Sequence, residues 1–168
     1  MESRAKFLGH PVHQMLVVFP LGLLATAVVF DVVYLLSELP VMAAVSYWMM
    51  AAGLVGALVA APFGLVDWLA IAPGTRAKKI GKLHGVGNGI VSVLFLGSWL
   101  LRGANEAYEP GALGYLLSFA GAGLALVTAW LGGELVSRLG VGVSDRAGLD
   151  APSSLDDRHE RSHVVNRR

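Results

Sequence analysis

Four long apolar runs dominate the pattern of hydrophobic and polar positions along the chain. The runs are His13–Leu36, Val41–Ala72, Leu83–Leu101 and Ala112–Leu135. Crossing a hydrocarbon core of about 30 Å takes roughly 20 apolar residues in a helix, so each run is long enough to span a membrane. The second run exceeds one crossing, which predicts either a turn near Pro62 or an interfacial end around Asp67–Ile71. The pattern predicts an all-α integral membrane protein, a bundle of four transmembrane helices.

Composition supports this class and divides the chain into two parts. Hydrophobic residues make up 55% and charged residues 15% of the chain, and mean hydropathy is +0.61. Soluble domains carry about 25% charged residues. Asp67 is the one charged residue from Val41 to Ala72, whereas the end of the chain is rich in charge. We therefore expect a transmembrane domain over residues 1–143 and a disordered, charged cytoplasmic tail over residues 144–168.

The positions of the basic residues predict the orientation in the membrane. Of thirteen Lys and Arg residues, twelve lie before the first run, between the second and third, or after the fourth, and only Arg102 lies on the other side. The positive-inside rule then places both termini in the cytoplasm of a multi-pass protein, which we expect in the bacterial inner membrane. A net charge of +1 gives no attraction to nucleic acid, and the lack of cysteine excludes c-type haem and cysteine-ligated clusters.

The second and fourth runs align with each other at a constant offset. Seven of thirteen positions are identical, from Ala52/Ala120 to Gly64/Gly132. His13 and His84 lie near the starts of the first and third runs. The pattern indicates two parallel hairpin repeats, although a bias toward alanine and glycine accounts for part of it. These small residues also let helices approach closely in lipid, where they favour helix packing or homo-oligomers.

Ionisable residues in or near the spans are the candidates for function, because charges are costly in lipid. They are His10, His13, Asp31, Asp67, His84 and Glu134. Asp31 lies roughly 27 Å beyond His13 at about 1.5 Å per residue, which puts it near the outer end. The other five lie at the cytoplasmic ends of the helices, where we expect them to form one cluster.

Three chemistries fit this cluster. Imidazoles and carboxylates on different helices bind transition metals, which predicts a metal site of His10, His13, Asp67, His84 and Glu134. Alternatively, His13 and His84 are the axial ligands of a b-type haem. A third interpretation is a proton relay or a gate for small solutes. Against all three stands a structural interpretation, in which the polar residues cap or anchor helices of a non-catalytic membrane anchor or oligomerising module.

The tail holds one motif that looks catalytic. His159-Glu160-Arg161-Ser162-His163 fits the H-E-x-x-H pattern of zinc proteases. It lies close to the end of the sequence in a charged segment, with no third ligand and no rigid helix to carry it. The motif therefore does not predict a protease.

Several stretches resemble a bacterial membrane family, domain of unknown function 2231. They are Gly9-His10-Pro11-Val12-His13, Phe19-Pro20-Leu21-Gly22 with Asp31, Gly64-x-x-Asp67-Trp68, Gly81-x-x-His84-x-x-x-Asn88 and Trp130-Leu131-Gly132-Gly133-Glu134-Leu135-Val136-x-Arg138. The resemblance extends over all four runs and implies a four-helix membrane protein of unestablished activity. Some relatives look like fusions to Rieske-type or cytochrome-like domains, which implies an electron-transfer setting and a redox partner protein. Relatives often carry His where this chain has Leu139.

Overall fold

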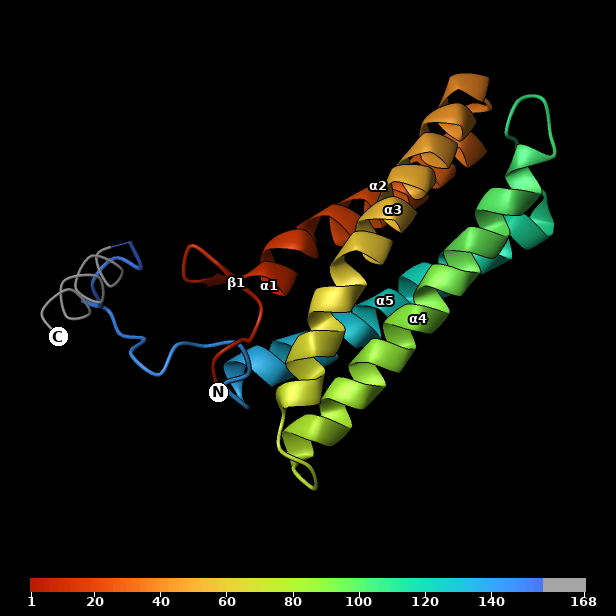
Figure 1. Ribbon diagram of the computed structural model, residues 1–168. Helices are drawn as coiled ribbons and strands as arrows, with labels where there is room; N and C mark the ends of the chain where they lie inside the picture. Colours follow the sequence, from red (N-terminus) through yellow and green to blue (C-terminus); the bar gives the residue numbers. More distant parts are fainter. Residues whose placement is uncertain (156–168) are drawn as a thin grey trace, which may run out of the picture.

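The computed structural model describes residues 1–155 and shows an elongated bundle of helices (Figure 1). A two-stranded hairpin, β1 (Lys6–Phe7) and β2 (His10–Pro11), comes first. The helices that follow are α1 (Val12–Leu16), α2 (Val18–Ser37), α3 (Pro40–Ala70), α4 (Arg76–Gly103) and α5 (Ala112–Ser137). Helices α1 and α2 together form one span, and α3, α4 and α5 form one each. These four segments of residues 1–155 are long and apolar enough to cross a membrane. The predicted all-α four-helix bundle is confirmed.

The helices pair as two hairpins. In Figure 1, α2 runs alongside α3 over much of their length, and α4 likewise accompanies α5. Between the hairpins, α3 packs on α4 and α2 on α5. The buried apolar residues where the hairpins meet are Leu24, Ala27, Met50, Val91 and Phe95.

Prolines and left-handed residues explain where the first two spans break and turn. Pro20 lacks the N–H that would bond to the Leu16 carbonyl, so α1 ends at Leu16 and α2 starts again at Val18. Glu38 adopts a left-handed backbone conformation (φ 55°) after α2, and Pro40 occupies the first turn of α3.

The third segment is a single helix. It continues through Pro62 and ends at Ala70. The alternative of a turn near Pro62 is therefore wrong, and the alternative of an end around Asp67–Ile71 is confirmed. Proline is tolerated within transmembrane helices because neighbouring groups satisfy the freed backbone.

The two ends of the bundle differ in what they carry. We call the end that holds residues 1–11 and the loop 71–75 the terminal end, and the end that holds the loops 38–39 and 104–111 the distal end (Figure 1). Residues 1–5 and 140–145 lie together at the terminal end, where the Met1 amino group donates to the Gly140 carbonyl (3.0 Å). Residues 144–155 contain no helix or strand, and the predicted disorder of the tail stays a prediction. The motif at 159–163 lies outside the described residues.

Candidate functional site

His13 is fixed by the partner helix of its own hairpin. Its Nδ1 lies 3.0 Å from the carbonyl oxygen of Ala60 on α3. A carbonyl only accepts hydrogen bonds, so Nδ1 carries a proton, and in the neutral ring Nε2 keeps a lone pair. The ring lies against Gly64, where a Cβ would stand 2.7 Å from His13 Cε1. Glycine at position 64 therefore makes room for the imidazole.

His84 repeats this arrangement in the second hairpin. Its Nδ1 donates to the carbonyl of Thr128 on α5 at 2.9 Å, and its ring lies over Gly132. The Asn88 amide nitrogen is nearly equidistant from the two ring nitrogens, at 3.4 and 3.3 Å, so it is not in line with either lone pair. In its neutral form, His84 thus also presents an Nε2 lone pair.

The equivalence of the two histidines extends along the hairpins. Gly64 and Gly132 differ in residue number by the same amount as Ala60 and Thr128. His13 and His84 differ by a slightly larger amount. The same two differences recur deeper in the bundle. A Cβ at Gly53 would meet Leu24, and a Cβ at Gly121 would meet Phe95, which are the counterparts under these differences. The hairpins therefore share their internal contacts, as the predicted parallel repeats require.

Asp67 is engaged away from the histidines. Its carboxylate accepts from the Ser3 hydroxyl at 2.8 and 2.7 Å and from the Arg4 backbone N–H at 2.7 Å. These bonds fasten the N-terminal segment to the end of α3. Asp67 is thus an anchor for this segment in the structure, and its predicted place in a metal cluster gains no support from this geometry.

The other two predicted ligands are also separate. The Glu134 carboxylate pairs with the guanidinium of Arg76 at 2.6 Å, which ties the end of α5 to the start of α4. His10 is exposed, with Nε2 3.3 Å from the Ser154 hydroxyl. In residues 1–155 no group of three His, Asp or Glu side chains is placed to hold a metal ion. The five residues do not form the expected single cluster there, because the carboxylates bond to other partners.

A second polar site lies toward the distal end. Arg102 and Asp31 are fully buried and form a bidentate pair, in which Nη1 and Nη2 each lie 2.6 Å from a carboxylate oxygen. The positive-inside count treats Arg102 as a residue outside the spans. It lies instead on the last turn of α4, facing inward. Asp31 is where the helix rise predicts it to be, near the distal end of α2.

Three buried serines complete this network. Ser46 on α3 and Ser118 on α5 donate to the two oxygens of Asp31 at 2.6 and 3.0 Å. Ser98 accepts from Arg102 Nε at 3.1 Å and donates to the carbonyl of Gly114 at 2.7 Å. All five N–H groups of the guanidinium have acceptors, and both carboxylate oxygens accept twice. The network joins α2, α3, α4 and α5 and leaves none of its charge unpaired.

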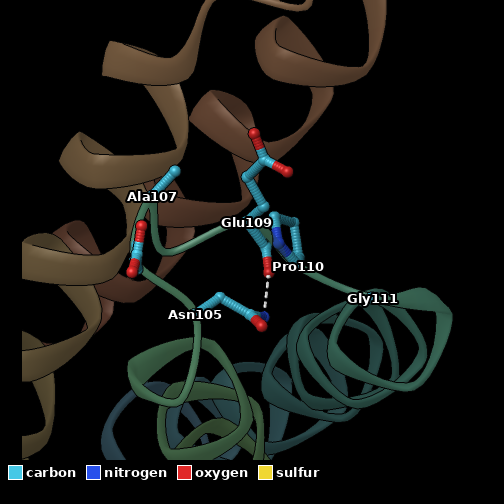
Figure 2. A pocket seen from close by; sticks show the side chains of 6 residues that line it. Asn105, Ala107, Glu109, Pro110 and Gly111 are labelled. Atoms are coloured by element: carbon cyan, nitrogen blue, oxygen red, sulfur yellow. Dashed lines mark hydrogen bonds between the residues drawn. The ribbon is translucent and has the colours of Figure 1, made fainter.

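An open hollow of about 410 Å³ lies in the loop between α4 and α5 (Figure 2). Asn105 donates to the Glu109 carbonyl across it at 2.9 Å. Glu106 and Glu109 give the hollow an acidic lining. It lies at the distal end, opposite the histidines.

The fold and the polar sites define an integral membrane protein, made of two similar hairpins joined by buried polar contacts. Residues 9–145 match the model of a family described as a predicted membrane protein, domain of unknown function 2231, and the chain belongs to this family. None of the curated proteins and none of the solved structures compared with the chain matches it.

Proposed function

We propose that this protein resides in the bacterial inner membrane with both termini in the cytoplasm, and binds a b-type haem between its hairpins through His13 and His84. The supporting observation is that both imidazoles use Nδ1 to donate to a backbone carbonyl, at 3.0 and 2.9 Å. This bond fixes the tautomer and the ring orientation, and leaves Nε2 as the ligand atom. The rings occupy equivalent positions in the two hairpins, each against a glycine of the facing helix.

The donor set favours haem over a bare metal ion. Structural zinc takes four protein ligands and catalytic zinc takes three, but the carboxylates of Asp67 and Glu134 are bonded elsewhere. The imidazoles of His13 and His84 remain. A b-type haem supplies the iron and four ring nitrogens itself, needs no cysteine, and contributes a one-electron couple when bound.

The chain's own residues then have defined roles. His13 and His84 hold the group from opposite hairpins, while the Ala60 and Thr128 carbonyls orient the rings and raise the donor strength of Nε2. Basic residues surround the terminal end, which favours an acidic redox partner protein approaching from that side. The proposed role is electron transfer at the membrane.

The test is a visible spectrum of the full chain, purified from membranes in detergent, before and after dithionite. We expect a Soret band that shifts on reduction, stoichiometric iron, and loss of both in His13→Ala and in His84→Ala. His10→Ala is the matched control and keeps the spectrum, because the His10 ring is exposed and, within residues 1–155, bonds only to Ser154. A colourless, iron-free protein, or full haem retention in both variants, overturns the proposal.

A second function, that of a non-catalytic membrane module, is favoured by the contact of each imidazole with a glycine of the facing helix. In that case the histidines lock α1 onto α3 and α4 onto α5. His13→Gln separates the two functions, since glutamine keeps an N–H donor for the Ala60 carbonyl but supplies no imidazole. If the protein is a non-catalytic module, we expect His13→Gln to have the thermal stability of the parent protein, and both the parent and the variant to be colourless.

A further inference from the structure

The buried ion pair joins equivalent positions of the two hairpins. Asp31 and Arg102 differ in residue number by the same amount as His13 and His84, and as Leu24 and Phe95. Exchanging the hairpins therefore places Asp31 where Arg102 is. Both contacts that this exchange relates, α3 on α4 and α2 on α5, are present, and the first is the more extensive. The pair thus lies near the axis that relates the repeats.

A protein built from two similar hairpins has a specific problem in the membrane. The first hairpin of one copy can pack against two similar partners. One is the second hairpin of its own chain, and the other is the first hairpin of another copy. The apolar residues at equivalent places differ in size, as Leu24 and Phe95 do, but both faces are built of small and apolar residues, and a difference in apolar packing alone sets no charge penalty on the wrong pairing. Selection then requires an element that penalises the wrong pairing.

We propose that Asp31 and Arg102 select the partner: they make the first hairpin pair with the second hairpin of its own chain and prevent it from pairing with its like in a second copy. Two first hairpins would bring Asp31 against Asp31 at the axis, and two second hairpins would bring Arg102 against Arg102. Like charges without compensation are strongly disfavoured inside a membrane. Only the mixed pairing neutralises both.

The surroundings of the pair fit this role. Both side chains have no exposed surface, and every donor and acceptor between them is used. The site therefore has no free group for a solute or a proton. A buried ion pair is weak evidence for stability, and its best-attested use is to specify register and partner.

Charge reversal provides the first test. Asp31→Arg places two arginines at the axis, and Arg102→Asp places two aspartates there. We expect each single variant to lose the monodisperse peak of the parent protein in detergent, and the double exchange, Asp31→Arg with Arg102→Asp, to regain most of it. Recovery stays incomplete because the place equivalent to Ser98, which supports Arg102, holds Ala27. An exchange variant no better folded than the single variants overturns the proposal.

Removal of both charges provides a second test that does not depend on recovery. The sequence lacks cysteine, so one introduced thiol reports contact between copies. Ala27→Cys places it one turn before Asp31, at a position that is fully buried in the paired hairpins. In membranes, we expect oxidation to yield monomer in this background and covalent dimer once Asp31→Asn and Arg102→Gln are added. Dimer in the first protein, or none in the second, overturns the proposal. Neither readout depends on haem.

Discussion

The imidazole of His13 lies on the backbone of Gly64, at a place that a side chain on residue 64 would fill. The nearest ring atom, Cε1, is 2.7 Å from the position of a Cβ there. His84 and Gly132 repeat the relationship at 3.1 Å. These glycines are therefore part of the candidate site, because they set how deeply each ring sits between the helices of its hairpin.

Gly64→Ala should displace the His13 ring and weaken its bond to the Ala60 carbonyl. Overpacking of this kind costs about 1–3 kcal/mol, which thermal unfolding in detergent measures. Gly133→Ala is the matched control, since a Cβ at Gly133 meets no atom of residues 1–155 within 4 Å and alanine favours the helix. Equal effects of the two substitutions would contradict the packing of His13 on Gly64.

The fold is predictable from the sequence to a large extent, because hydrophobic length decides it. The predicted spans His13–Leu36 and Ala112–Leu135 agree closely with the observed helices at both ends. The third run starts too late, at Leu83, because the basic residues Arg76–Lys82 interrupt its hydropathy. In the structure α4 starts at Arg76, capped by the Thr75 hydroxyl, which accepts from the Lys78 N–H.

The candidate site is predictable only in part. The residue types indicate that His13 and His84 share a level, but no spacing rule shows that the Asp67 carboxylate bonds to residues 3 and 4, which precede the first span. The ion pair between Asp31 and Arg102 is not predicted, because the positive-inside rule counts an arginine near the end of a span as a loop residue. Asp31 and Arg102 differ in residue number by the same amount as His13 and His84. This equal spacing is the feature of the sequence that indicates the pair.

Ser98→Ala should destabilise the bundle more than its position on α4 suggests. The variant leaves Arg102 Nε without an acceptor in a fully buried site and removes the bond to the Gly114 carbonyl of α5. An unsatisfied buried donor costs about 1–3 kcal/mol. Ser92→Ala is the control, as its hydroxyl donates only to Asn88 of the same helix, and we expect a change within about 0.5 kcal/mol. Denaturation of both variants in detergent measures the difference, and similar values would contradict the inferred role of Ser98.

Asp67→Asn should release the N-terminal segment from the end of α3. The substitution removes the charge that accepts from Ser3 and from the Arg4 N–H. Hydrogen bonds to charged groups contribute about 1.5–3 kcal/mol, so the Arg4 amide should exchange its hydrogen roughly ten- to a hundredfold faster. Glu134→Gln, which loses an ion pair with Arg76 elsewhere at the terminal end, should leave this amide unchanged. Unaltered exchange in Asp67→Asn would show that other contacts hold the segment.

The contact between the N-terminal segment and residues 144–145 should depend on pH through Glu2. The pKa of Glu2 is lowered from 4.5 to about 2, first by its bond from Lys6, then by the Ser144 hydroxyl and the Asp145 N–H. A lowered pKa means that the folded contact favours the ionised carboxylate. Its contribution is therefore complete above pH 4.5 and is lost as the pH falls toward 2. The carboxyl carbon shift of Glu2, followed by NMR, should titrate near 2, and the Asp145 amide signal should move with it. Glu2→Gln removes that transition, whereas titration of Glu2 near 4.5 would show that the segments are not joined through this carboxylate.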